Sequence, residues 1–324
     1  MQFSDAYEKI LSYDFLDDDT KKHIYLEDGD KHMCRFCGKG EDETVFDKSA
    51  HAISEMVGNR WLFSYRECKK CNIAFGNTCE DSFGKFVLPL KIVSQVYGKK
   101  RSIGYSNEHS QIKINKEDAI LPEFSEDIKA LIKSNEENSV LIPEKDGFIL
   151  KLVRKRYIPQ LVYFSLLKMA LTILPFEEYE KYVHCYAMLY AVSREEEKTD
   201  GINVCGFEEF IPGPERFKCT NAELYRVKNM FGNRPYMYFC LNFGNYSLQI
   251  PLPTDQQQRG KSISVVGCKH HDKSEIRILR FNEFEEIFQC HFSAVMKEVV
   301  GEEKERLAKC LNLEFQNRAE DSVK

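Results

Sequence analysis

Two C-x-x-C pairs constrain the fold of this chain more than any other feature of its sequence. Cys34 and Cys37 form the first pair, and Cys68 and Cys71 form the second after thirty intervening residues. Each C-x-x-C turn can present two thiolates to one ion about 2.3 Å away, so two turns complete a tetrahedron. Gly38 follows the first pair and allows a tight turn. Four thiolates fill the coordination sphere, which predicts a structural Zn²⁺ and not a catalytic one.

A zinc ion would also compensate for a small core. A segment such as 31–100 buries little apolar surface on its own. Structural zinc contributes roughly 10–16 kcal/mol in small peptides, which is enough to define a fold. A redox pair or chance spacing is the alternative interpretation of the four cysteines.

The remaining cysteines are scattered singly, which is typical of small buried hydrophobic residues in a reducing compartment. One local cluster, Cys268-x-His270-His271, resembles a set of metal ligands. It lies in a polar turn, however, which favours a turn without a bound metal. The scattered positions are Cys79, Cys185, Cys205, Cys219, Cys240, Cys268, Cys290 and Cys310.

The length of 324 residues predicts more than one domain, because one hydrophobic core rarely organises a chain of this size. Four segments are expected. Residues 1–30 form a short helix (Phe3 to Leu11) and an acidic run, and residues 31–100 form the zinc domain. Residues 101–147 form a polar linker with a helix near Glu126 to Lys133, and residues 148–324 form a second domain.

Residues 148–324 alternate between strand-like and helix-like patterns, which predicts an α+β domain. Pro175 separates two apolar helices, and Gly244-Asn245 marks the turn of an aromatic hairpin. The expected strands are Phe148 to Tyr157, Tyr236 to Phe243, Tyr246 to Leu252, Ser262 to Val266 and Ile276 to Leu279. The expected helices are Leu161 to Leu174, Phe176 to Val192, Phe284 to Val299 and Lys304 to Leu313.

The charge is distributed unevenly along the chain. The net charge is −5, yet residues 31–101 hold thirteen Lys and Arg against eight Asp and Glu. A locally basic segment can bind phosphates while the whole chain stays acidic, although a modest excess is also typical of a solvated surface. No apolar run is long enough to span a membrane, and residues 1–11 lack a signal-peptide pattern. We therefore expect a cytoplasmic protein without a membrane segment.

The residues between and after the cysteine pairs carry a further pattern. The first stretch reads His51-Ala52-Ile53-Ser54-Glu55-Met56-Val57-Gly58-Asn59, and the second reads Cys68-Lys69-Lys70-Cys71-Asn72-Ile73-Ala74-Phe75-Gly76. Over residues 31–90 this pattern resembles the HNH endonuclease family, in the branch that runs approximately His-Ile-x-Pro-Glu-x-Leu-Gly-Gly and then Cys-x-x-Cys-Asn-x-x-Phe-Gly. The expected architecture is therefore an N-terminal zinc-stapled ββα-metal domain followed by a C-terminal α+β domain.

The resemblance implies a catalytic role for His51 and a metal-site role for Asn72. A histidine near its ordinary pKa can accept a proton from water at neutral pH, worth roughly 10²–10⁴ in rate. A divalent Mg²⁺ or Mn²⁺ ion would absorb charge on the scissile phosphate. A structural histidine and a helix N-cap are the alternative interpretations of these two residues.

The sequence departs from the family pattern at three points. Ala50 stands where an acidic metal ligand is common, Ser54 replaces a proline, and no asparagine precedes Cys68 at the position of the middle Asn. Replacement carboxylates lie nearby, and we expect Glu80 and Asp81 to contribute to the catalytic metal site, with Glu67 as a third candidate. Phosphate contacts are expected from Arg60, Arg66, Lys69, Lys70 and Lys85.

These observations favour a metal-dependent endonuclease that acts on DNA, in bacterial restriction or anti-phage defence. The alternative is a zinc-stabilised nucleic-acid or protein binding module whose nuclease centre has decayed. In a third interpretation, residues 148–324 bind a regulatory ligand or partner protein and control the nuclease. Domains appended to such nucleases also recognise targets or form homo-oligomers, which is an analogy at the level of domains only.

Overall fold

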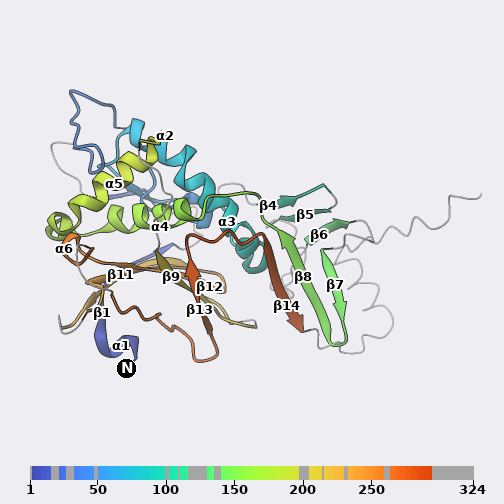
Figure 1. The fold of residues 1–324 in the computed structure, drawn as a ribbon. Coiled ribbons are helices and arrows are strands. Elements are labelled where there is room, and N and C mark those ends of the chain that lie inside the picture. The colour runs from blue at the N-terminus through green and yellow to red at the C-terminus, as the bar shows by residue number, and fades with distance from the viewer. Residues whose placement is uncertain are drawn as a thin grey trace, which may run out of the picture.

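The computed structural model describes most of the chain and shows an α+β architecture (Figure 1). The described residues are 2–15, 22–26, 33–46, 50–98, 102–108, 110–115, 130–134, 140–196, 204–213, 215–229, 233–258 and 263–293. The largest unit is a six-stranded sheet in which every neighbouring pair is antiparallel, in the order β1-β10-β11-β12-β9-β13. Its strands are β1 (Tyr7–Phe15), β9 (Cys205–Phe210), β10 (Thr220–Val227), β11 (Met237–Phe243), β12 (Tyr246–Leu252) and β13 (Glu275–Arg280).

The central hairpin of β11 and β12 is buried on both faces of the sheet. Along β11, Phe239 and Leu241 belong to the main core, whereas Tyr238 and Cys240 belong to a smaller core on the opposite face. This alternation follows from the two-residue period of a strand. The smaller core is completed by the short helix α1 (Phe3–Ala6) and by an extended segment, residues 263–270.

Helices cover the face of the sheet that carries Phe239 and Leu241. Helix α4 (Pro159–Ile173) contacts β11 and β12, and the 3₁₀ helix η5 (Phe176–Tyr182) leads into α5 (Val183–Ser193). In α4 the residues from Val162 to Ile173 are buried without interruption. A helix that is buried on all sides needs packing partners on opposite sides. The large sheet packs on one side of α4, and the zinc domain packs on the other (Figure 1).

The zinc domain lies on the helical layer, so its core is continuous with that of the large sheet. It contains the 3₁₀ helix η1 (Glu55–Val57), β3 (Leu62–Ser64), α2 (Lys69–Asn77) and α3 (Cys79–Ser94), and β2 (Ile24–Leu26) of the preceding segment pairs with β3 in parallel. Helix α3 packs on α4, and α2 reaches α5. At the end of α3, Ser94 Oγ accepts a hydrogen bond of 3.0 Å from the backbone of Asn245 in the β11–β12 turn. A side chain at position 244 would clash with Ser94, so this position of the turn requires glycine.

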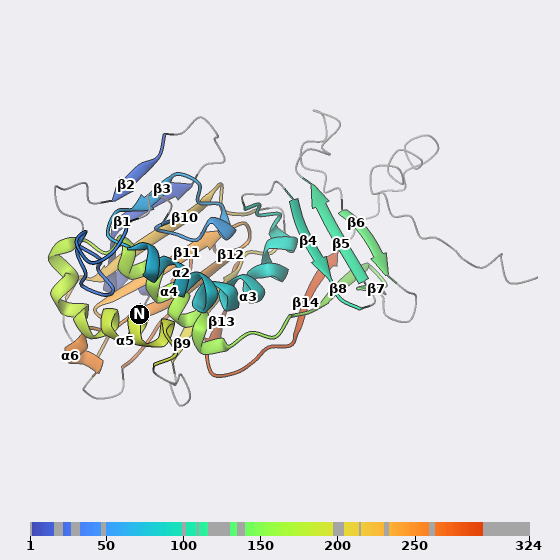
Figure 2. The same cartoon turned by 90° about the horizontal axis from the view of Figure 1, so that it is seen from above.

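Two small sheets extend to one side of this body, on the right in Figure 2. One contains β4 (Ser102–Ser106), β5 (Ser110–Asn115) and β6 (Ala130–Ser134), and the other contains β7 (Leu141–Glu144), β8 (Gly147–Val153) and β14 (Ile287–Ser293). The Tyr105 hydroxyl joins them, because it donates to the carbonyl of Val153 at 3.2 Å and accepts from its amide at 3.0 Å. The last described helix is α6 (Asp255–Gln258).

The α+β class is confirmed, as are the aromatic hairpin, the helical pair broken at Pro175 and the strand near Ile276. The helix expected from Phe3 to Leu11 is wrong beyond Ala6, because β1 begins at Tyr7 and pairs with β10. Residues 130–133 and 287–293 are strands where helices were expected, since pairing with neighbouring strands overrides a weak helical period. Residues 263–266 form no strand. The expected helix from Lys304 to Leu313 lies outside the described residues.

None of the described helices is long and apolar enough to cross a membrane.

Candidate active site

The four paired cysteines converge on one point. Their sulfur atoms all lie within 4.8 Å of one another, and Cys37 Sγ lies 3.7 Å from Cys68 Sγ. Two sulfurs bound to one tetrahedral zinc at 2.3 Å would be separated by about 3.8 Å, so the spacing fits the ion. Gly38 has a φ of +69°, which confirms the left-handed turn expected after the first pair. The chemistry and geometry of this donor set fit structural Zn²⁺.

The first knuckle also anchors the zinc domain to the helical layer. Arg35, between the two cysteines, is buried, and its guanidinium donates to the carbonyls of Leu171 at 2.9 Å and Leu174 at 3.0 Å. These carbonyls lie at the C-terminal end of α4, where backbone acceptors have no partner within the helix. A cation there also complements the helix dipole.

His51 lies on a short extended segment that precedes a loop. Residues 50–52 run antiparallel to β3 and share two backbone hydrogen bonds with it, of 2.9 and 3.0 Å. The imidazole packs on the ring of Phe63, with 4.5 Å between the centroids. Helix α2 follows β3, so the local order is strand, loop, strand, helix. This is the ββα arrangement that the sequence predicts.

Asn59 holds the loop between these two extended segments. Its buried amide nitrogen donates to the carbonyls of Ile53 at 2.7 Å and Leu62 at 2.8 Å. Its amide oxygen accepts from the backbone nitrogens of Trp61 at 3.2 Å and Leu62 at 2.9 Å. One side chain thus satisfies four backbone groups of a buried turn, which explains why an asparagine stands after the left-handed Gly58.

His51, Asn72 and Glu80 line one pocket of about 270 Å³. Asn72 lies in the first turn of α2, but Cys68 is the N-cap, so the N-cap interpretation of Asn72 is excluded. The chain breaks helical geometry at Thr78, and Glu80 nevertheless reaches the same pocket from the first turn of α3. The other lining residues are Ser54, Glu55, Met56 and Gly76.

Glu55 brings a second carboxylate to this pocket. Sequence reasoning did not select it as a site residue, although its spacing four positions after His51 matches the family pattern. Within the described part of the chain, His51, Glu55 and Glu80 do not approach one another as closely as the four cysteines do. The pocket therefore leaves space between its polar groups.

Lys168 of α4 lies beneath this pocket. Its ammonium lies 3.0 Å from the Glu67 carboxylate, 3.2 Å from the Glu80 carboxylate and 3.3 Å from the carbonyl oxygen of His51. Both Lys168 and Glu67 are buried. Burial opposes the charge on Lys168, but the two carboxylates outweigh it and raise the pKa of the ammonium. Burial raises the pKa of Glu67 to about 7, against the opposing influence of Lys168.

Asp81, the other predicted acidic residue, is not among the residues that line the pocket with His51. Its carboxylate pairs with Lys85 at 2.6 Å on the exposed side of α3. Ala50 is fully buried and offers only a methyl group at the position where the family commonly has an acid.

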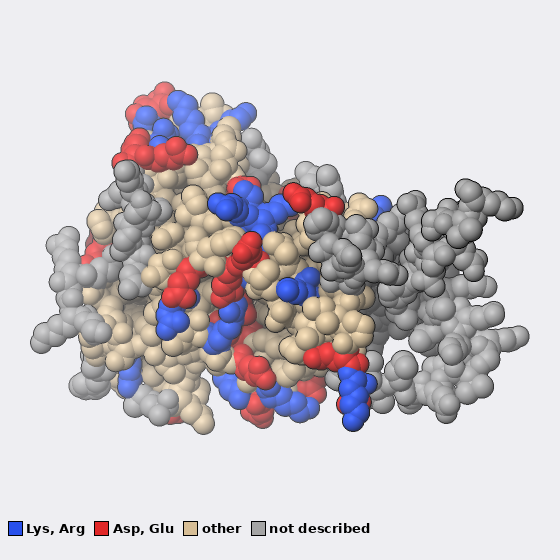
Figure 3. Space-filling model, turned by 45° about the vertical axis from the view of Figure 1, so that its right-hand side comes forward, with Lys and Arg blue, Asp and Glu red and all other residues tan. Residues whose placement is uncertain are grey.

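The predicted phosphate contacts differ in their surroundings. Lys69 and Lys70 are exposed in the first turn of α2, whereas Lys85 is paired with Asp81 and Arg66 lies 5.5 Å above the ring of Phe176. On the face drawn in Figure 3, basic and acidic side chains are interspersed among the described residues, which form no continuous basic surface there.

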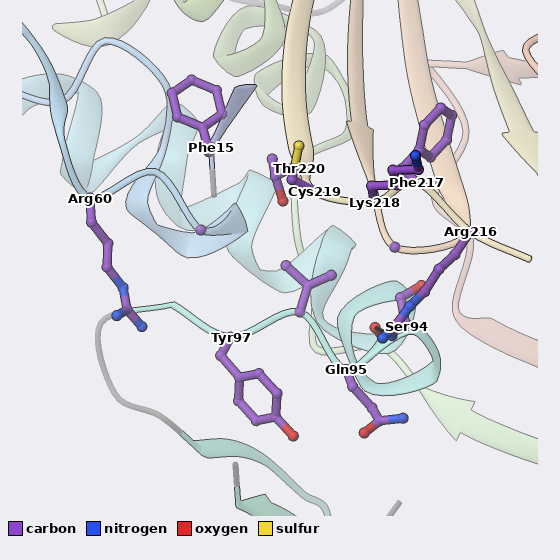
Figure 4. Close-up of a pocket in the computed structure, with 13 residues that line it drawn as sticks. Phe15, Arg60, Ser94, Gln95, Tyr97, Arg216, Phe217, Lys218, Cys219 and Thr220 are labelled. Atoms are coloured by element: carbon purple, nitrogen blue, oxygen red, sulfur yellow. Dashed lines mark hydrogen bonds between the residues drawn. The ribbon is translucent and has the colours of Figure 1, made fainter. Parts of the chain in front are cut away.

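Arg60 takes part in a separate basic pocket of about 260 Å³ (Figure 4). Arg60 comes from the loop before β3, and Arg216 and Lys218 come from the segment before β10. None of the residues described as lining this pocket is acidic. Three basic residues thus line this pocket from different sides, and Arg60 and Arg216 donate to the carbonyls of Gly98 at 3.1 Å and Ser94 at 3.4 Å.

Besides Glu55, two further residues of this region were missed by sequence reasoning. Lys168 is more than eighty positions from Glu80 and sits in an apolar helix, so only the tertiary fold brings it to the site. Asn59 carried a usable signal, since Gly-Asn between two extended segments is typical of a tight, side-chain-stabilised turn.

Comparison with known proteins agrees with this geometry. Residues 34–88 match the family model described as HNH endonuclease, and this range contains both knuckles, His51 and Asn72. The chain therefore contains an HNH endonuclease domain with a zinc-knuckle arrangement of cysteines. Searches of curated proteins and of solved structures found no match.

Proposed function

We propose that this protein is a metal-dependent endonuclease that hydrolyses phosphodiester bonds of DNA, with His51 as the general base. The observation that carries the proposal is the pocket that His51, Asn72 and Glu80 line together. These residues come from three separate segments of the chain, as expected for side chains that converge on one ion or substrate.

The pocket can also hold the cation that such a reaction needs. Mg²⁺ keeps several of its waters and commonly binds through one or two carboxylates and the phosphates of the substrate. Asn72 and Glu80 would hold such an ion, with Glu55 as a second carboxylate on the same pocket. A bound divalent cation supplies electrostatic stabilisation of the charge that develops on the phosphate.

The protein residues would divide the remaining work. The imidazole of His51 would accept the proton of the attacking water, and its packing on Phe63 would fix the orientation of the ring. Lys168 would act as a positioning residue, since its ammonium pairs with Glu80 and also binds the carbonyl of His51. It would hold α3 against the extended segment of His51.

Binding of the nucleic acid backbone would use the basic groups near this pocket. Lys69 and Lys70 are exposed at the start of α2, where the helix dipole also favours phosphate. The basic pocket of Arg60, Arg216 and Lys218 would extend the contact onto the large sheet. Such contacts position the substrate without reading its sequence. Restriction or anti-phage defence would be the biological setting of this activity.

The alternative is a decayed nuclease that binds nucleic acid or a protein through a zinc-stabilised scaffold. Two observations favour it. Ala50 removes an acidic group from the site, and the Glu80 carboxylate is already engaged by Lys168.

The test is to incubate the purified full chain with plasmid DNA, single-stranded DNA and RNA, each with Mg²⁺, Mn²⁺ or EDTA. The proposal expects metal-dependent nicking or cleavage of DNA. Cleavage of RNA alone would overturn the choice of substrate. Binding of nucleic acid without cleavage under either metal would favour the decayed module.

A further inference from the structure

A second group of metal-ligating side chains lies far from the nuclease pocket, on the opposite face of the large sheet. The donor atoms of Cys240, Cys268 and His270 all lie within 4.8 Å of one another. Cys240 is on β11, and the other two lie in the extended segment before β13. Both thiols are buried. Sequence reasoning treated Cys268 and His270 as part of an ordinary turn, because Cys240 is almost thirty residues away.

The backbone around Cys268 is held firmly against the sheet. The buried side chain of Gln249 on β12 accepts from the amide of Cys268 at 2.7 Å and donates to its carbonyl at 2.7 Å. The amide of Val266 donates to the hydroxyl of Tyr238 at 3.0 Å. The position of the Cys268 thiol is therefore fixed by the fold and not by a mobile turn.

The imidazole of His270 is oriented by a carboxylate on its outer side. Its Nδ1 lies 2.6 Å from Glu209 Oε2, while Glu209 Oε1 accepts from the His270 amide at 2.7 Å and from Ser274 Oγ at 2.6 Å. This contact makes Nδ1 the protonated nitrogen and leaves Nε2 as a lone-pair donor. A carboxylate behind the ring is the usual arrangement for a histidine that binds metal.

A carboxylate lies beside the imidazole on its inner side. Glu223 on β10 is directly opposite Cys240 in the register of the sheet, and its Oε2 lies 3.4 Å from His270 Nε2. The same carboxylate is held by the hydroxyl of Tyr225 at 2.8 Å and the ammonium of Lys9 at 2.9 Å. The Glu223 oxygens are not among the donor atoms that all lie within 4.8 Å of one another, so this carboxylate borders the group of two sulfurs and one imidazole nitrogen.

We propose that Cys240, Cys268 and His270 form a second structural zinc site, which fastens residues 263–270 to the face of the large sheet. The spacing supports this assignment. Around a tetrahedral zinc, sulfur and nitrogen ligands would be separated by about 3.6 Å. The observed separation from Cys268 Sγ to His270 Nε2 is 3.6 Å, and Cys240 Sγ lies within 4.8 Å of both atoms.

The chemistry of the donors selects the same ion. Thiolate and imidazole ligands favour zinc over Mg²⁺ or Ca²⁺, which prefer oxygen. Both thiols are buried against the sheet and leave little access for a substrate, so the ion would be structural. This inference does not depend on the nuclease activity, and either can fail alone.

Zinc content of the purified full chain tests the proposal. Elemental analysis is expected to give about two zinc ions per chain for the wild type, because each site holds one. Cys37→Ser and Cys268→Ser are each expected to lose one ion. Cys290→Ser, which removes a buried thiol on β14 outside both sites, is the matched control and should keep two. A wild type with one zinc, lost entirely in Cys37→Ser, would overturn the proposal.

X-ray absorption at the zinc edge tests the proposal on the wild type, without relying on a variant that folds. The mean coordination should be about three sulfurs per zinc, the average of a four-sulfur and a two-sulfur site. Four sulfurs per zinc would overturn the second site. Detection of a Cys240–Cys268 disulfide in the freshly purified protein would overturn it as well.

Discussion

The ammonium of Lys168 lies 3.2 Å from the carboxylate of Glu80, which ties a buried helix of the second domain to the pocket of His51. The same ammonium also neutralises the fully buried Glu67 at 3.0 Å. Removal of one partner from a buried ion pair leaves an uncompensated charge, whereas replacement of the whole pair by uncharged groups is often tolerated. The nuclease domain and the helical layer should therefore depend on this lysine.

Lys168→Met should lower the free energy of unfolding by about 3–5 kcal/mol, because Glu67 would remain buried without a cation. Lys168→Met combined with Glu67→Gln should regain a large part of that loss. Urea denaturation of the wild type, both single variants and the double variant measures the coupling. Additive losses in the double variant would show that the pair does not act as a unit.

Glu80 and Asp81 make a matched pair of acidic residues on adjacent positions. Glu80→Gln should reduce DNA cleavage by roughly 10–100-fold, the range for changes around a metal site. Asp81→Asn should leave the rate nearly unchanged, since Asp81 pairs with Lys85 away from the pocket. Initial rates at saturating Mg²⁺ and Mn²⁺ measure both. Equal losses in the two variants would remove Glu80 from its proposed role.

Loss of the zinc knuckle should unfold the nuclease domain. The binding energy of structural zinc, roughly 10–16 kcal/mol, is comparable to the whole stability of a typical domain. Cys37→Ser should therefore abolish cleavage and expose residues 33–98 to limited proteolysis, while Cys79→Ser, at a buried thiol outside the cluster, should not. Protease-resistant Cys37→Ser protein with wild-type activity would contradict the structural role of the ion.

Lys91 of α3 gives a prediction for the dependence of stability on pH. Burial lowers the pKa of Lys91 to about 8. The unfolded chain keeps its lysine protonated up to a pKa of about 10.4, so between these values the unfolded state binds more protons and stability rises with pH. Below pH 8 the cost of burying the charge is fully present. Lys91→Met should thus stabilise the protein at pH 7, with an advantage that shrinks from pH 8 to 10.

Unfolding midpoints of wild type and Lys91→Met, measured side by side across this range, isolate the contribution of one lysine. A difference that stays constant with pH would contradict the lowered pKa.

The sequence predicts those site residues whose spacing along the chain is itself diagnostic. The four cysteines, His51 and Asn72 are recognisable because their spacing carries the chemistry. Glu80 reaches the pocket from a second helix, which begins after the break at Thr78. Lys168 and Cys240 could not be predicted in this way, since each meets its partners only after α4 or β11 has packed. Asp81 and Glu80 are adjacent in sequence, and only the break at Thr78 and the packing of α3 separate the pocket residue from the surface residue.

The same distinction applies to the fold. The aromatic hairpin and the helices on either side of Pro175 have strong local patterns, and they were predicted with nearly correct bounds. The segments from Tyr7 to Leu11 and from Ile287 to Ser293 carry no strong period of their own. They are strands because β10 and β8 offer them backbone partners.

The most direct test of the account is single-turnover cleavage of DNA by His51→Ala, with binding of the same DNA measured in parallel. The account predicts that cleavage falls by about 10²–10⁴-fold while binding stays close to that of the wild type, because His51 acts on the proton and not on the backbone. His184→Ala, which removes an exposed histidine of α5, should cleave normally. Undiminished cleavage by His51→Ala would contradict the central claim.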